Sequence, residues 1–111
     1  MIKCMLILAC LFITIGLTGQ TVFTVNGASL AQVSIFVVKY ESQADLKVFK
    51  VPYASQAGTN DGRWFFTDYA SQAQKKIYFA QYESQADLKI FFVQYASQAG
   101  WRDMSKKHLM Y

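Results

Sequence analysis

The sequence predicts an all-β, compact single-domain repeat fold, made of short strands joined by six Ser-x-Ala turn repeats. A tripeptide of this pattern recurs six times at a nearly constant spacing. Each copy follows a short segment rich in β-branched and aromatic residues, which favour strands. The chain has 111 residues, 53% of them hydrophobic, which suffices for one small domain and excludes a multi-domain enzyme.

The first nineteen residues have the layout of a secretory signal peptide. Lys3 is their only charge, residues 4–15 are apolar apart from Thr14, and Gly-Leu-Thr-Gly closes the segment at 16–19. The apolar run is shorter than the ~20 residues that a membrane-spanning helix needs. We therefore expect a protein that is exported to the periplasm, the cell surface or the medium. Removal of 1–19 would leave 20–111 as the mature domain, without an integral membrane segment.

Both cysteines, Cys4 and Cys10, lie in this leader, so the expected mature domain has no disulfide. Lipid attachment at Cys10 is a weaker alternative, because only six leader residues precede the Ile-Leu-Ala-Cys segment. A second small-x-small pattern ends at Ala31, but cleavage there would destroy the first repeat. We therefore expect cleavage near Gly19.

The repeat extends well beyond the tripeptide. Successive serines are separated by 13, 13, 16, 13 and 13 residues. A tyrosine stands two positions before the serine in five copies, and an aromatic residue stands four positions before that in all six. These aromatic residues are Phe23, Phe36, Phe49, Phe65, Tyr78 and Phe91. Such a period indicates one supersecondary unit per repeat.

A longer period divides the domain into two three-repeat halves, 21–58 and 63–100. Residues 33–58 match residues 75–100 at 17 of 26 positions. The three extra residues of the 16-residue spacing lie between the halves, in the Gly-Thr-Asn-Asp-Gly segment 58–62. Asn, Asp and Gly favour tight turns, so we expect a turn there.

Within a repeat, a segment such as 88–95 is expected to be a strand because of its composition and its length of about eight residues. Period two puts Phe91 on one face and Ile90 and Phe92 on the other. Both faces are apolar, so we expect both to be covered, with rings such as Phe49 and Phe91 in the core.

Two segments depart from the repeat. Pro52 interrupts the second expected strand, which indicates an edge or a position whose amide has no ladder partner. The tail 101–111 lacks the motif, and we expect it to cap the end of the domain, as atypical terminal units of repeat proteins do.

The Tyr-Glu-Ser-Gln-Ala-Asp-Leu-Lys blocks at 40–47 and 82–89 resemble an uncharacterised family of small, mostly bacterial domains with 13-residue repeats. The resemblance covers 21–111, although the first copy departs from the motif at Gly27 and Leu30. It implies a compact β fold whose chain is tied into a seven-crossing torus knot, the septoil knot. It implies no catalytic residues, and a knot would imply slow unfolding.

The repeated serines are expected to be structural and not nucleophiles. A nucleophilic serine needs an adjacent base, and the only histidine is His108, near the C-terminus. Small side chains let neighbouring connections approach, and hydroxyls satisfy backbone groups at turns. We therefore expect no enzymatic activity.

Metal and cofactor sites are not expected either. Two acidic pairs recur with a lysine in the same repeat: Glu41 and Asp45 with Lys47, and Glu83 and Asp87 with Lys89. The same arrangement recurs in both halves, which favours a surface charge pattern over a calcium site or acid–base catalysis. His108 has no second histidine or mature cysteine to complete a zinc site, and no glycine-rich phosphate loop is present.

Net charge gives no support for a nucleic-acid partner. Without Lys3 the mature chain has ten basic and seven acidic residues, hence a net charge of +3. The basic residues are spread along the chain, with a local cluster formed by Lys106 and Lys107 beside His108.

The candidate ligand contacts are two aromatic-basic pairs, Arg63 with Trp64 and Trp101 with Arg102. Each pair follows a glycine beside the least regular segments, where binding residues tend to lie. An exposed tryptophan would stack on a sugar ring of an envelope glycan or on a base. Core packing or end-capping is the competing interpretation for both tryptophans.

These observations favour an exported, non-enzymatic structural or interaction domain of high kinetic stability, present as a monomer or a small homo-oligomer. A subunit of an extracellular β fibre is one alternative, because segments such as 90–93 have the β-propensity of steric zippers. An envelope glycan-binding module is another. The distinct tail argues against the fibre, since a fibre subunit keeps its end free for the next copy.

Overall fold

The computed structural model describes residues 19–111, so the predicted leader lies almost entirely outside the described residues. In this part of the chain the sheet has seven strands. They are β1 (Thr21–Thr24), β2 (Val33–Val37), β3 (Leu46–Lys50), β4 (Arg63–Phe66), β5 (Lys75–Phe79), β6 (Leu88–Phe92) and β7 (Gly100–Trp101). The predicted all-β repeat fold is confirmed.

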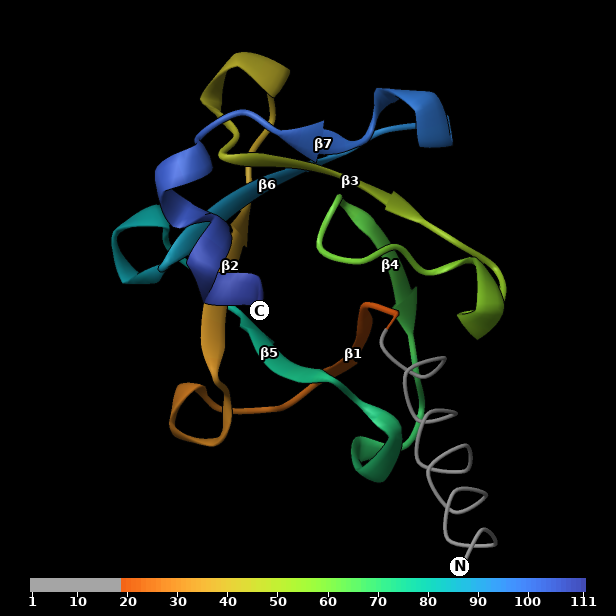
Figure 1. The fold of residues 1–111 in the computed structure, drawn as a ribbon. Helices are drawn as coiled ribbons and strands as arrows, with labels where there is room; N and C mark the ends of the chain where they lie inside the picture. Colours follow the sequence, from red (N-terminus) through yellow and green to blue (C-terminus); the bar gives the residue numbers. More distant parts are fainter. Residues whose placement is uncertain (1–18) are drawn as a thin grey trace, which may run out of the picture.

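Strands β1 to β6 form a closed parallel barrel (Figure 1). Their order around the barrel is β4-β1-β5-β2-β6-β3, and pairing of β3 with β4 closes the ring. The short β7 is antiparallel to β3 and pairs with its first residues, Leu46 and Lys47. Full closure satisfies the ladder on both sides of each barrel strand.

The order shows that the two halves of the sequence interleave. Strands β1, β2 and β3 belong to the first half, and β4, β5 and β6 occupy the gaps between them. Connections within a half therefore skip one strand of the ring, whereas the connection from β3 to β4 leads to the adjacent strand. The longer 16-residue spacing coincides with this single different step.

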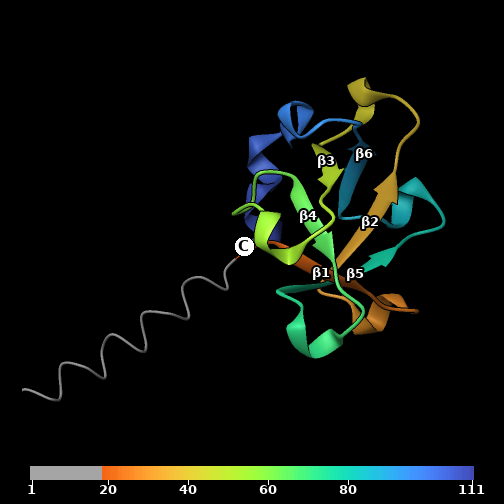
Figure 2. The ribbon, with the colours of Figure 1, turned by 90° about the vertical axis from the view of Figure 1, so that its right-hand side faces the viewer.

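The connecting turns protrude from the barrel and carry the repeated motif (Figures 1 and 2). Each is one short 3-10 turn, closed by a bond such as that from the Ala44 amide to the Glu41 carbonyl, 3.0 Å. The turns are η2 (Ala28–Leu30), η3 (Glu41–Gln43), η4 (Ala54–Gln56), η5 (Ala70–Gln72), η6 (Glu83–Gln85) and η7 (Ala96–Gln98).

Within each half, the residue directly after Ser-x-Ala fastens the connection to the strand that it crosses. The Asp45 amide donates to the Lys89 carbonyl at 2.7 Å, and the Asp45 carboxylate accepts from the Lys89 amide at 2.9 Å. Asp87 makes the same pair of bonds with Ser34, and Gln32 makes it with Lys76. The predicted acidic pairs therefore contain backbone clamps, which spacing alone did not reveal.

The core inside the barrel is built mainly from one sequence position that recurs in every repeat. This position lies directly before the repeated aromatic residue, and all six of its members are fully buried: Val22, Ile35, Val48, Trp64, Ile77 and Ile90. Val33, Leu46, Leu88 and Met110 complete the cluster. The bulky Trp64 replaces Val or Ile only in the short strand β4.

The expectation that Phe49 and Phe91 are core residues is wrong. Both are half-buried, because the repeated aromatic position points away from the barrel interior. Crossing turns cover the outer face only in part; η7, for example, lies against β3. A six-stranded ring has room inside for one apolar face per strand, and the other face supplies this outer belt.

Both ends of the barrel are closed by side chains. At the N-terminal ends of the strands the tail forms η8 (Met104–Met110), whose Met110 is fully buried in the core (Figures 1 and 2). At the other end, Phe66, Phe79 and Phe92 pack against the core, and the Lys50 ammonium lies 5.0 Å from the ring centroids of Phe66 and Phe92. The tail thus caps the barrel, while Pro52 is exposed just after β3 ends.

Adjacent residues on β6 give a direct test of the inward and outward faces. Ile90→Ala removes a fully buried side chain and should lower the free energy of unfolding by about 2–5 kcal/mol. Phe91→Ala should cost clearly less, because its ring is only half-buried. Urea denaturation of both variants measures the difference. A larger loss for Phe91→Ala would contradict this assignment of faces.

The backbone clamp gives a second prediction. Asp45→Ala leaves the Lys89 amide without its side-chain acceptor at a buried position, so unfolding free energy should fall by about 1–3 kcal/mol. Glu41→Ala serves as the control, because the exposed Glu41 carboxylate makes only a 3.6 Å ion pair with Lys47. Equal stability losses in the two variants, measured by thermal and urea denaturation, would argue against the clamp.

Candidate functional site

Arg63 and Trp64 lie at the seam between the two halves. The Trp64 side chain is fully buried in the core, and its indole nitrogen has no partner within the described residues. Arg63 is bound to Asp61, with its Nε and Nη2 atoms at 2.9 and 2.6 Å from one carboxylate oxygen. Trp64 therefore has the core role, and Arg63 fixes the linker between the two halves, residues 58–62.

The linker itself needs residues that tolerate left-handed backbone. Asn60 has φ of 63° and Gly62 has φ of 93°. A Cβ on Gly62 would also lie 2.4 Å from the Lys47 carbonyl oxygen, so only glycine fits at this approach to β3. The predicted turn at 58–62 thus directs the chain to the adjacent strand of the ring.

Trp101 and Arg102 hold the tail against the barrel. The Trp101 indole donates to the Asn60 carbonyl at 3.0 Å. The Arg102 Nη1 atom lies 3.0 to 3.2 Å from three carbonyl oxygens around the end of η3, those of Glu41, Ser42 and Ala44. All four predicted contact residues therefore make internal contacts, and the structure does not join them into one site.

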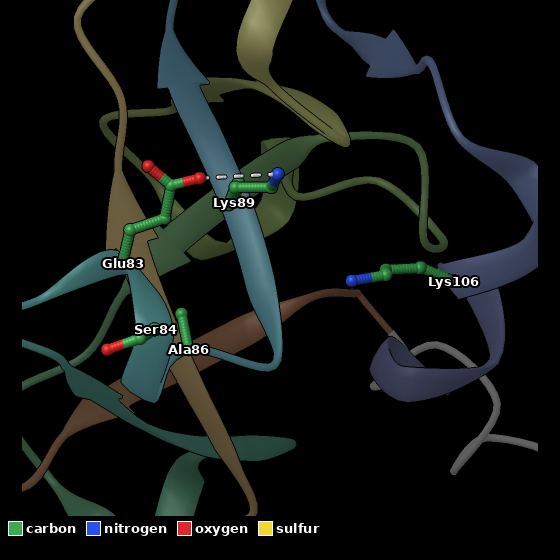
Figure 3. Close-up of a pocket in the computed structure, with 5 residues that line it drawn as sticks. All are labelled: Glu83, Ser84, Ala86, Lys89 and Lys106. Carbon is green, nitrogen blue, oxygen red and sulfur yellow. Dashed lines mark hydrogen bonds and ion pairs between the residues drawn. The ribbon is translucent and has the colours of Figure 1, made fainter.

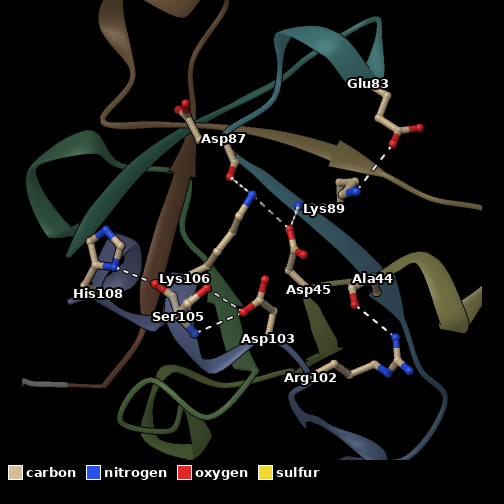
Figure 4. A network of polar contacts seen from close by, with 10 residues as sticks. All are labelled: Ala44, Asp45, Glu83, Asp87, Lys89, Arg102, Asp103, Ser105, Lys106 and His108. Carbon is tan, nitrogen blue, oxygen red and sulfur yellow. Dashed lines mark hydrogen bonds and ion pairs between the residues drawn. The ribbon is translucent and has the colours of Figure 1, made fainter.

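A polar network continues along the tail (Figure 4). The Asp103 carboxylate accepts from the Ser105 amide and hydroxyl, at 3.1 and 2.6 Å. Lys106 donates to the Asp87 carbonyl at 3.1 Å and lies 3.6 Å from the Asp45 carboxylate. The Nδ1 atom of the His108 ring lies 3.0 Å from the nearby Ser105 carbonyl oxygen. These contacts stabilise the cap, and residues 19–111 contain no cluster of potential metal ligands.

An open pocket of about 450 Å³ lies between η6, β6 and the tail (Figure 3). Its lining includes Glu83, Ser84, Lys89 and Lys106, and the Glu83 carboxylate pairs with Lys89 at 3.5 Å. The Ser84 hydroxyl points away from both lysines in Figure 3. The geometry therefore supplies no base for this serine, and both nearby lysines already have oxygen partners.

The turns present a regular set of exposed side chains around the barrel. One tyrosine precedes each of five turns, and these rings are 60–67% exposed: Tyr40, Tyr53, Tyr69, Tyr82 and Tyr95. The following serines are exposed as well, and their hydroxyls make no hydrogen bond within residues 19–111. The motif thus repeats tyrosine rings that are largely exposed and serine hydroxyls that have no hydrogen-bond partner in the described part of the chain.

A groove of about 840 Å³ lies at the seam, between turns η4 and η5. Phe65 of β4 contributes its half-buried ring, and no charged residue occurs among the described lining residues. These are Gly19, Thr21, Ala54, Ser55, Phe65, Thr67, Ser71, Gln72, Ala73 and Gln74. The sequence signal for this groove is the single 16-residue spacing between serines, at Ser55 and Ser71, and not the aromatic-basic pairs.

Two hydroxyls fix the shape of the groove. Thr21 donates to the Gln72 carbonyl at 3.0 Å and accepts from the Gln74 amide at 3.1 Å. Thr67 is nearly buried, donates to the Gln72 side chain at 3.3 Å and accepts from the Tyr69 amide at 3.2 Å. Turn η5 is therefore tied to both β1 and β4, which makes this part of the surface preorganised.

Comparison with known proteins identifies the class of the fold. The model of the 7(1) septoil knot domain family matches residues 19–102, more than half of the chain. The chain therefore belongs to the septoil knot domain family, as the repeated blocks indicated. Searches of the curated proteins and of the solved structures gave no match. Among the described residues, no helix has the length and apolarity to cross a membrane.

The Asp61–Arg63 pair predicts a specific pH dependence. Burial raises the pKa of Asp61, but hydrogen bonds and charge from Arg63 outweigh it and hold this pKa below its ordinary value of 3.8. The stability gained from this carboxylate is therefore present above that value and is lost as pH falls through the lower folded pKa. Because both side chains are over 40% exposed, the contribution is below about 1 kcal/mol.

Asp61→Asn should therefore destabilise the protein slightly at pH 6 and not at pH 2. Urea denaturation of the wild type and the variant across this range measures the difference in unfolding free energy. Asp68→Asn is the matched control, because Asp68 is exposed and has no ion pair within the described residues. A difference that persists unchanged at pH 2 would contradict the role of the ionised pair.

Proposed function

We propose that this chain is an exported, non-enzymatic interaction domain of high kinetic stability, which binds its partner through the exposed motif turns. The observation that carries this proposal is the set of five tyrosines that are 60–67% exposed. Their serine neighbours are also exposed and make no internal hydrogen bond within the described residues. Packing alone does not require these side chains, although the repeat retains them.

A ring of equal turns favours multivalent binding. The barrel holds each turn on a rigid strand pair, so a partner with repeated units would engage several turns at once. Each further contact then becomes intramolecular, and avidity exceeds the affinity of one turn. Envelope polymers are partners of this kind.

Absence of enzymatic activity is supported by how the reactive groups are engaged. His108 contacts the tail backbone, and Asp45 and Asp87 accept backbone amides. Ser84 has no base beside it. We likewise propose that the domain needs no cofactor and binds no nucleic acid, since its basic residues are scattered or paired with acids.

Export and kinetic stability are supported by the leader and by the winding of the chain. Residues 1–19 have the signal-peptide layout, and the expected mature chain has no cysteine. Interleaved halves mean that no half can leave the barrel without breaking pairings with the other. We propose that the chain is threaded as its family name says, so that unfolding requires the tail to pass back through the winding.

The closed ring also favours a monomer or small homo-oligomer over a fibre subunit. The zipper-like segment 90–93 includes the end of β6, which pairs with β2 on one side and β3 on the other. Its ladder is therefore occupied, and no long strand edge of the described barrel is open to a second copy.

Co-sedimentation with isolated bacterial envelopes tests the turn surface. We expect the wild type to sediment, and stepwise Tyr→Ala replacement at the five turns to weaken binding more steeply than in proportion to the number removed. Phe36→Ala, which removes a half-buried ring from the outer belt, is the control. Unchanged sedimentation of a folded variant lacking all five tyrosines would refute the proposal, as would absence of wild-type sedimentation.

Unfolding kinetics test the stability claim. In water at 25 °C we expect an unfolding rate at or below about 10⁻⁶ s⁻¹, the slow end of the range for small domains. The buried Trp64 provides the fluorescence signal, and the rate follows from guanidinium-dependent unfolding extrapolated to water. An unfolding half-life of seconds would contradict kinetic stabilisation by threading.

A further inference from the structure

We propose that the seam groove between η4 and η5 binds a neutral oligosaccharide. This deepens the proposed function and rests on it, because it names the ligand class for one place on the turn surface. The groove combines an aromatic ring with hydroxyl and amide groups, and its described lining residues carry no charge on a chain of net charge +4. Phosphates, uronic acids and acidic peptides would find no cation in that lining.

The aromatic part of the site is Phe65. Its ring is half-buried, so one part packs on the barrel while another lines the groove. A pyranose presents apolar C–H groups on one face, and these pack against an aromatic ring as other apolar groups do. The groove volume of about 840 Å³ lies within the range of small-molecule sites.

The polar part is supplied by both flanking turns. Ser55 and Ser71 line the groove, are exposed, and make no hydrogen bond within residues 19–111. Each hydroxyl both donates and accepts, which suits the hydroxyls of a sugar. Thr21 and Thr67 are already engaged in holding η5, so they position the groove and do not contact the ligand directly.

The duplication gives a reason why the site exists once. Only the connection from β3 to β4 leads to an adjacent strand, and the groove lies between the turns on either side of β4. Every other connection skips a strand. Other repeats therefore contain the same residue at the same position of the turn, but outside the groove, and these positions serve as controls.

The test is an NMR titration of the protein purified from an exporting bacterial host. Maltohexaose, cellohexaose and chitohexaose are the neutral probes, and a hexa-uronate is the charged one. We expect at least one neutral probe to shift the amides of Phe65 and Ser71, with the uronate bound more weakly. Ser71→Arg, which adds bulk and charge on an exposed turn, should weaken that binding about tenfold or more.

Ser97→Arg is the matched control, because Ser97 occupies the same Tyr-Ala-Ser-Gln-Ala motif on η7 and does not line the groove. Phe65→Ala and Phe91→Ala form a second pair in one register. Equal effects within each pair, or tighter binding of the uronate, would overturn the proposal. Suppose that sugar binding survives Ser71→Arg but is lost when the five tyrosines are replaced. That result would overturn the assignment of the sugar site to the groove, while the proposed function would still stand. Absence of binding by every neutral probe would also overturn that assignment, while envelope sedimentation judges the proposed function separately.

A second observation, the burial of Gln20, locates the leader cleavage site. Gln20 is fully buried, its amide donates to the Gly58 carbonyl at 2.8 Å, and its side chain donates to Gln74 and to the Met110 carbonyl, each at 2.8 Å. Cleavage after Gly19 would convert the buried backbone nitrogen of Gln20 into an N-terminal ammonium group, with the Gly58 carbonyl as its one acceptor. Burying such a charge is strongly unfavourable.

We infer that the leader is removed before Gly19, again provided that the proposed export takes place. Gly19 is only half-buried, so its amine can be hydrated there. Gly16 and Thr18 then form a small-x-small pattern, whereas cleavage after Gly19 puts Leu17 at the first of these positions. The family match also begins at Gly19.

Intact-mass analysis of the exported protein tests this inference. We expect the mass of residues 19–111. A chain that begins at Gln20, or its cyclised form lighter by one ammonia, would overturn the inference and keep export. An uncleaved chain found only in the cytoplasm would overturn both the inference and the export proposal.

Discussion

Within each half of the sequence, every connection crosses one strand of the other half, and this crossing is the constraint on which the rest of the structure depends. A connection that skips a strand must lie over it, and the residue after Ser-x-Ala fastens it there through backbone and side-chain bonds, as Asp45 does with Lys89. This fixes the turn on the outside, leaves a gap for a strand of the other half, and keeps all six barrel strands parallel. The core, the outer aromatic belt and the exposed turns follow from this arrangement.

The seam is the one place where this arrangement changes. Asn60 and Gly62 adopt left-handed backbone there, Asp61 is bound to Arg63, and the chain enters the adjacent strand β4. Trp64 then fills a core position that is Val or Ile elsewhere. The same irregularity leaves a groove beside Phe65 whose described lining residues carry no charge, so the departure from symmetry gives the surface a distinctive site.

Much of the fold could be predicted from the sequence, because the repeat register is unusually regular. The strands, the six turns and the capping tail follow from local composition and from where the motif stops. The assignment of faces failed at Phe49 and Phe91, since two apolar faces look alike in sequence and only the radius of a closed ring decides which side is the interior. Interleaving of the halves was not predictable, because pairing between distant strands leaves no local signal.

The site was predicted less well for a related reason. Trp64 and Trp101 are conspicuous in the sequence, but one fills the core and the other donates to the linker carbonyl of Asn60. The exposed tyrosines were visible as a repeat, but the sequence could not show that they lie outside the barrel. The groove depends on residues of β1, β4 and two turns that only the closed ring brings together.

Native-state hydrogen exchange tests the central claim most directly, namely that two interleaved halves form one closed unit. If each strand is held by neighbours from the other half, the core amides of β1 to β6 should all exchange through the same global unfolding, with one free energy and one denaturant dependence. Exchange of β4, β5 and β6 at a markedly lower free energy than β1, β2 and β3 would show that one half opens by itself. That result would contradict the interleaved barrel.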